Sequence, residues 1–160
     1  MAASVRRSAG LLLFRRPSGG GLEVLIAHTG GPFFAKKDLA AWSIPKGEYE
    51  PDETPEAAAR REFTEELGLP VPDGPLVELG EITQRNGKIV TAWALEADLD
   101  PTTIVPGTFE LELPRGSGRF VDTPEVDRVA WFAPDEARER LFAGQSEFLD
   151  RLEALLRSDG

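Results

Sequence analysis

The segment from Gly47 to Leu69, GEYEPDETPEAAARREFTEELGL, constrains this chain most, because it places eight carboxylates within 23 residues. Its second half is predicted to be a helix. Thr54 is a suitable N-cap, Pro55 fits the first helical position, and Gly68 can end the helix in the left-handed conformation. Like charges at helical spacing repel each other. The helix is therefore expected to be either a solvated acidic face or a site for a cation.

Three of the carboxylates are predicted to project from one narrow face of that helix. Glu62, Glu65 and Glu66 are spaced i, i+3 and i+4, beside an apolar stripe that can pack on a sheet. Partial burial of these groups would destabilise the helix or raise their pKa values. A divalent cation would remove the conflict, since it binds carboxylate oxygens well. Arg61 is expected to turn back to Glu53 and hold the preceding loop.

The composition restricts the chemistry further. The chain has no cysteine and a single histidine, so a metal site would use mainly oxygen ligands, which favours Mg²⁺ or Mn²⁺. The formal net charge of −10 argues against a nucleic-acid polymer as partner, but is compatible with a small phosphorylated substrate. Because no apolar run is long enough for a membrane span or a signal peptide, we expect a cytoplasmic protein with no membrane partner.

The remaining chain is predicted to be α+β and to form one domain over residues 1–160, with residues 1–4 and 157–160 flexible. The first two expected strands form a hairpin, and so do the two on either side of the Asn86-Gly87 turn. A C-terminal helical region is expected over residues 134–156, with a break suggested at Gly144. The third strand is expected to stop at Pro45. The expected strands are 8–15, 22–28, 41–44, 76–84, 88–99, 109–113 and 126–132.

The acidic segment resembles the Nudix box, GX5EX7REUXEEXGU, in which U is a bulky apolar residue. Gly47, Glu53 and the run from Arg61 to Leu69 match every fixed position. The similarity extends, less specifically, over roughly residues 6–132, including the short strand before the box and the hairpin after it. It implies the Nudix α/β/α sandwich, with a mixed β-sheet, a central box helix and a C-terminal helix.

The resemblance implies a metal-dependent hydrolase that cuts a pyrophosphate bond in a nucleoside diphosphate linked to another group. Mg²⁺, or Mn²⁺ in its place, would be held by Glu62, Glu65, Glu66 and the carbonyl of Gly47. The implied general base is Glu62 or Glu65, or else an acid outside the box. Glu125, just before the last predicted strand, is the candidate for that outside acid, and an exposed loop carboxylate is the alternative interpretation.

Other residues outside the box have two interpretations each. Asp122 and Asp127 are alternatives to Glu125. His28 is expected to be structural rather than a substrate contact, and Trp42 and Trp131 are expected to lie in the core. Four cations are candidates for contacts with the substrate phosphates, and each is equally well explained as a solvated side chain; they are Lys46, Lys36, Lys37 and Arg6.

Subfamily markers for the substrate are absent or weak. The only tyrosine, Tyr49, lies inside the box, so the downstream tyrosine of diadenosine polyphosphate hydrolases is missing. The lead-in WSIPKGE is similar to that of hydrolases of small nucleotides, which favours a nucleoside triphosphate or a dinucleoside polyphosphate as substrate. An ADP-ribose or nucleotide-sugar pyrophosphatase, a non-catalytic nucleotide sensor and an acidic protein-interaction domain remain alternatives. A monomer and a homodimer are both compatible with the sequence.

Overall fold

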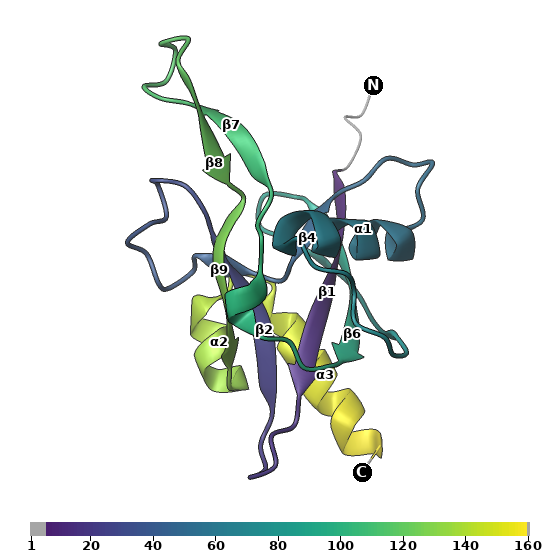
Figure 1. Ribbon diagram of the computed structural model, residues 1–160. Coiled ribbons are helices and arrows are strands. Elements are labelled where there is room, and N and C mark those ends of the chain that lie inside the picture. Colours follow the sequence, from purple (N-terminus) through teal and green to yellow (C-terminus); the bar gives the residue numbers. More distant parts are fainter. Residues whose placement is uncertain (1–5, 160) are drawn as a thin grey trace.

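A mixed seven-stranded sheet forms the centre of the computed structural model, which describes residues 6–159 (Figure 1). The strands of this sheet are β1 (Arg7–Arg15), β2 (Glu23–Thr29), β3 (Trp42–Ser43), β4 (Lys46–Glu48), β5 (Val77–Thr83), β6 (Ile89–Glu96) and β9 (Val126–Phe132). A separate two-stranded ribbon consists of β7 (Thr108–Glu112) and β8 (Phe120–Pro124). The helices are α1 (Pro55–Leu67), α2 (Pro134–Arg140), α3 (Ser146–Asp159) and the short 3₁₀ helix η1 (Pro101–Thr103).

Strand β1 lies at the middle of the sheet, whose main order is β3-β2-β1-β6-β5. It runs parallel to β6 and antiparallel to β2 and β4, while β9 pairs with the other edge of β2. The two predicted hairpins, β1–β2 and β5–β6, are confirmed. The sheet is mixed because β6 reaches β1 only after the chain has passed through helix α1.

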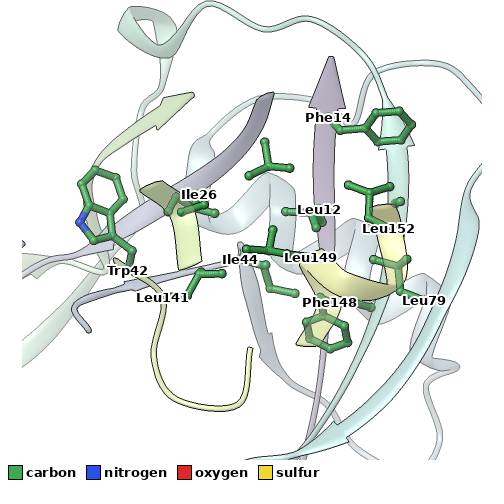
Figure 2. Packing of buried hydrophobic residues seen from close by; sticks show 14 of the residues in the cluster. Leu12, Phe14, Ile26, Trp42, Ile44, Leu79, Leu141, Phe148, Leu149 and Leu152 are labelled. Carbon is green, nitrogen blue, oxygen red and sulfur yellow. The ribbon is translucent and has the colours of Figure 1, made fainter. Parts of the chain in front are cut away.

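Both faces of the sheet are covered, as in an α/β/α sandwich. Side chains alternate along β1, so that Leu11 and Leu13 join the cluster under α1 while Leu12 joins the cluster under α2 and α3. On the second face, Phe148 and Leu149 of α3 pack against the sheet (Figure 2). The predicted fold class is therefore confirmed.

Helix α1 begins and ends where the sequence predicts. The Thr54 hydroxyl accepts a hydrogen bond from the Ala57 N–H at 3.2 Å, Pro55 is the first helical residue, and Gly68 has a φ of 69°. A side chain on Gly68 would also meet the carbonyl of Val105, so glycine is required for two reasons. These caps fix the orientation of the acidic helix face.

Several predictions about the elements need correction. Strand pairing was expected to stop at Pro45. Instead, residues Lys46–Glu48 form a further strand, β4, which pairs with β1. Strand β8 was not predicted, although its partner β7 was. The suggested break at Gly144 is confirmed, because α2 ends at Arg140 and α3 begins at Ser146. Helix α3 extends to Asp159, and the flexibility expected for residues 157–160 stays a prediction. Residues 1–4 and 160 lie outside the described part.

The ribbon β7–β8 projects away from the body of the sheet (Figure 1). Its two ends are tied to the body: the Gly107 N–H donates to the Glu65 carbonyl at 3.2 Å, and the Glu125 N–H donates to the Gly107 carbonyl at 2.9 Å. The ribbon therefore begins beside α1 and returns the chain to the sheet at Glu125. None of the helices within residues 6–159 has the length and apolarity needed to cross a membrane.

Candidate active site

The acidic face of α1 packs against strand β4, and Gly47 makes this approach possible. A Cβ atom on Gly47 would lie 2.0 Å from the carboxyl carbon of Glu62, far inside van der Waals contact. Glu62 is buried there, and burial raises its pKa, although Arg61 opposes the shift. The sequence therefore needs glycine at this position so that a buried carboxylate can lie directly on the strand.

Arg61 compensates the charge of three acids, one in the loop before α1 and two on the helix itself. Its guanidinium bonds both carboxylate oxygens of Glu53 at 2.8 Å, as predicted, and also bonds Glu62 at 2.7 Å and Glu65 at 3.1 Å. The hydrogen bonds from Arg61 lower the pKa of Glu53. A single cation thus orders the loop before α1 and holds two of the predicted metal ligands.

Glu66 is in a different environment from these three acids. Its Oε1 accepts a hydrogen bond from the backbone N–H of Lys46 at 2.9 Å, and no arginine pairs with it among residues 6–159. Burial raises its pKa to about 8, the Lys46 N–H opposes the shift, and the nearby charge of Glu125 adds to it. Burial also lowers the pKa of the Lys46 side chain. The charged form of Glu66 is therefore destabilised until a cation is provided.

Glu125 joins this end of the site from a distant part of the chain. It lies between β8 and β9, where its N–H donates to Gly107 and its carbonyl accepts from the Gly30 N–H at 3.1 Å. Burial raises the pKa of its carboxyl, and the charge of Glu65 adds to the shift. The backbone is thus held on both sides, and the carboxyl group faces the cleft described next.

A cleft of about 440 Å³ brings Lys46, Glu66 and Glu125 together. Its other lining side chains come from β2 and β3, from the turn between β5 and β6, and from the segment between α2 and α3. They include Thr29, Ser43, Gln84, Arg85, Asn86, Lys88, Phe142 and Gln145. Carboxylates at one end and cations and amides around the rest suit an anionic ligand that binds together with a metal ion.

The remaining predicted phosphate contacts do not line this cleft. Arg6 pairs with Glu48 on the surface, at 2.8 Å from its Nε. Lys36 and Lys37 lie on the loop between β2 and β3, and the ammonium of Lys37 lies 5.4 Å from the ring centre of Phe34. Of the four predicted cations, only Lys46 lies in the cleft of this structure.

The alternatives to Glu125 are engaged elsewhere or turned to solvent. Asp127 bonds the Nδ1 of His28 at 2.9 Å, while Asp122 is exposed on β8 opposite Glu110. His28 is completely buried, contacts the Lys37 carbonyl through Nε2 at 2.6 Å, and packs edge-on against Trp42. The structural interpretation of His28 agrees with these contacts.

The cleft residues of the β5–β6 turn and of the segment before α3 were not predicted from the sequence. Arg85 and Lys88 flank the Asn-Gly turn, and the sequence predicted only a turn position for Arg85 and a strand position for Lys88. Nothing in the local sequence marks Gln145 as a buried glutamine. The signal available for Arg85 was its place next to a tight turn, where an exposed cation can reach a ligand.

The donor set fits a hard divalent cation. Between residues 6 and 159, no three acidic side chains stand together as a preformed ligand set. Two of the predicted ligands, Glu62 and Glu65, are instead paired with Arg61. The buried carboxylate of Glu62 and the half-buried carboxylate of Glu66, both with raised pKa values, are nevertheless oxygen donors whose charge the protein leaves incompletely compensated. The carboxylate oxygens of these two residues are therefore suitable ligands for a hard divalent cation.

The family model of the NUDIX domain matches residues 4–152 of this chain. The chain belongs to the Nudix family. It is a Nudix pyrophosphohydrolase, and the acidic segment Gly47–Leu69 is its Nudix box. No curated protein has a significantly similar sequence.

Solved structures agree with the Nudix fold. An Ap4A hydrolase from C. elegans in a binary complex is 22% identical, with a TM-score of 0.66 over 96% of this chain and 99% of that one. The NUDIX domain of Shewanella oneidensis NrtR complexed with ADP ribose is 15% identical, with a TM-score of 0.66 over 97% and 90%. The Nudix hydrolase RenU from M. smegmatis is 25% identical, with a TM-score of 0.56 over 96% and 86%.

Proposed function

We propose that this Nudix protein is a Mg²⁺-dependent pyrophosphohydrolase of nucleoside triphosphates or dinucleoside polyphosphates. The observation that carries the proposal is the convergence of Glu66, Glu125 and Lys46 in one cleft. In this proposal Glu66 is a metal ligand, Glu125 accepts a proton, and Lys46 binds a phosphate oxygen.

Glu62 and Glu66 would hold the metal, joined by Glu65 and the carbonyl of Gly47. Mn²⁺ suits the same oxygen ligands. When bound, the metal withdraws charge from the phosphate oxygens and lowers the pKa of an attacking water. Arg61 would support this arrangement by keeping Glu62 and Glu65 oriented while the ion is absent.

Glu125 is the proposed general base. Among residues 6–159, no side-chain donor bonds its carboxylate, whereas Glu62 and Glu65 are both held by Arg61. Its raised pKa brings the carboxyl closer to neutral pH, which makes it a more effective proton acceptor than an ordinary glutamate. Lys46 would neutralise a phosphate oxygen from the side of β4.

The charge of the cleft supports a polyphosphate as substrate. In a chain with a net charge of −10, three cations line this one cleft: Lys46, Arg85 and Lys88. A chain of several phosphates would use more of these cations than a single diphosphate. The similarity of fold to an Ap4A hydrolase makes dinucleoside polyphosphates a sensible class to test.

The test is a phosphate-release screen with Mg²⁺, with Mn²⁺ and with EDTA. The panel contains nucleoside triphosphates, dinucleoside polyphosphates, ADP-ribose and nucleotide sugars. We expect metal-dependent cleavage of a triphosphate or dinucleoside polyphosphate at a higher kcat/KM than of ADP-ribose or a nucleotide sugar. A preference for ADP-ribose would overturn the substrate proposal, and equal turnover in EDTA would overturn the metal proposal.

A further inference from the structure

The turn between β5 and β6 presents an arginine to the cleft. Arg85 is exposed at the cleft and forms no ion pair with a carboxylate of residues 6–159. Neighbouring Lys88 has only a long contact with Glu48, at 3.7 Å. Most other arginines of this acidic chain are paired, so the unpaired guanidinium of Arg85, which lines the same cleft as Glu66 and Glu125, is available for a ligand. Guanidinium groups suit phosphate because their donors match its oxygens in pairs.

The turn is rigid enough to place that arginine. The Gln84 N–H donates to the Lys88 carbonyl at 2.8 Å, and the Gly87 N–H donates to the Gln84 carbonyl at 2.9 Å. The Lys88 N–H donates to the Asn86 side chain at 3.0 Å. Gly87 has a φ of 88°, which a tight Asn-Gly turn requires. The backbone that carries Arg85 is thus closed by three hydrogen bonds of its own.

A buried glutamine connects this turn with the metal side of the cleft. Gln145 is completely buried, and its Oε1 accepts from the Ile44 N–H at 3.0 Å. Its Nε2 donates to the Ser43 hydroxyl and to the Gln84 side chain, both at 3.1 Å. Buried polar groups are costly unless they are bonded, so these contacts determine where Gln145 sits. Through them it joins three segments that are far apart in sequence.

These connections define the spacing between the two sides of the cleft. Ser43 and Ile44 lead directly into Lys46, whose N–H holds Glu66. Gln84 opens the turn that carries Arg85. The Gln145 side chain thus bonds both the turn and the segment that leads to the peptide next to the carboxylates.

We propose that Arg85 binds the substrate phosphates that lie away from the metal, and that Gln145 is the residue that positions the turn for this contact. The inference deepens the proposed function, on which it rests, by assigning to this turn a preference for substrates with at least three linked phosphates. It predicts that the turn contributes to substrate binding and not to the chemical step.

The first experiment compares Arg85→Ala with Arg119→Ala. Arg119 is also exposed, lies outside the cleft on the β7–β8 ribbon and loses the same charge when replaced. Because a charge-assisted contact is lost, we expect Arg85→Ala to raise KM for ATP and for a diadenosine tetraphosphate about tenfold or more, with kcat changed less than twofold. We expect Arg119→Ala to behave like the parent. Equal KM values for the two variants would overturn the assignment.

The second experiment tests the positioning role with Gln145→Met, which keeps the volume and removes the hydrogen bonds. Its thermal melting is measured first, and Gln84→Ala replaces it if the protein does not fold. Either change should raise KM for ATP several-fold. In a double mutant with Arg85→Ala the effect should largely disappear, since the glutamine acts through that arginine. If the effects of the two substitutions on KM are additive, Gln145 has only a structural role and the proposed positioning of Arg85 by Gln145 is overturned.

A binding measurement separates this inference from the proposed function. Inorganic tripolyphosphate is titrated into the full chain with Mg²⁺, using the parent, Arg85→Ala and Arg119→Ala. We expect about tenfold weaker binding for Arg85→Ala alone. If the parent binds tripolyphosphate through Arg85 but hydrolyses no nucleotide, the proposed function fails while the inference holds. If it hydrolyses a nucleotide but Arg85→Ala binds tripolyphosphate normally, the inference fails alone.

Discussion

The acids of the candidate active site and of the loop before α1 fall into two groups that differ in what neutralises them. On the side of the preceding loop, Arg61 pairs with Glu53 and Glu65, and the pKa of Glu53 is lowered. On the cleft side, Glu66 and Glu125 have no arginine partner among residues 6–159, and their pKa values are raised, mainly by burial. The same residue type is thus charge-compensated by the protein in one place and left for an external cation in the other.

Glu62 lies between the two groups. It receives a hydrogen bond from Arg61 at 2.7 Å, yet burial still raises its pKa. The helix therefore carries more acid than Arg61 can compensate. We infer that a bound cation would supply the charge compensation that Arg61 does not.

The strongest test of this comparison is Glu66→Gln. The change keeps the shape of a cleft-side acid but removes a metal-ligand charge, so we expect activity to fall about 100-fold or more. The melting temperature of the metal-free protein should stay the same or rise, because a buried group that resists ionisation has been removed. Phosphate release and thermal unfolding followed by circular dichroism measure the two effects.

Glu56→Gln is the matched control, since Glu56 is exposed on the same helix. It should retain the parent activity. A Glu66→Gln variant that hydrolyses substrate like the parent would remove Glu66 from the metal site.

A second test displaces a ligand without changing any charge. In Gly47→Ala the new Cβ would occupy the place of the Glu62 carboxyl group, which can move because it is the flexible end of a side chain. We expect activity to fall about 10- to 100-fold through misplaced ligands, with only a small loss of stability. Steady-state kinetics and a melting curve distinguish this from unfolding. A variant with normal activity would show that Glu62 does not need its position on β4.

The pH dependence of metal binding gives a third test. Because burial raises the pKa of Glu66 to about 8, its carboxyl holds a proton at neutral pH in the metal-free protein. Mg²⁺ must displace that proton, so affinity should rise with pH by up to about tenfold per unit below pH 8 and level off above it. Isothermal titration calorimetry across this range measures the slope. In Glu66→Gln the slope should become shallower, and an unchanged slope would assign the proton to another group.

The same raised pKa has a consequence for folding. The folded metal-free protein binds the Glu66 proton more tightly than the unfolded chain does. Its stability should therefore fall as pH rises from the ordinary glutamate range towards 8, and Mg²⁺ should restore it. Melting curves with Mg²⁺ and with EDTA at several pH values test this sign. A metal-free protein that becomes more stable over this range would contradict it.

The smallest effect is expected on the compensated side. Glu53→Gln weakens a partly exposed pair with Arg61, so the melting temperature should fall by only about 1–3 °C at neutral pH. Because Arg61 lowers the pKa of Glu53, the contribution is present above the ordinary glutamate pKa and is lost as pH falls below it. The difference between variant and parent should therefore disappear in acid. A large loss of activity in this variant would place Glu53 nearer to the metal than the structure does.

The sequence alone determined the elements whose signals are local. The caps of α1, the spacing of Glu62, Glu65 and Glu66, and the pairing of Arg61 with Glu53 all depend on residues within one short segment, and the structure confirms the caps and the pairing. The two hairpins were also predictable, because alternating apolar residues and turn residues mark them. The family resemblance had the same local basis, since nearly all of its specific signal lay in the box.

The tertiary structure decided which residues share the cleft. Strand pairing and helix packing bring Glu125, Arg85 and Gln145 into the same cleft as Glu66. These residues come from segments far apart in the chain, so no local sequence pattern encodes their proximity. Strand β4 was missed because its three residues are recognised only by their pairing with β1. Which acid is neutralised by Arg61 and which is left for a cation likewise depends on burial. Burial is a property of the packed molecule, because the cost of a charge depends on all the atoms that exclude water from it.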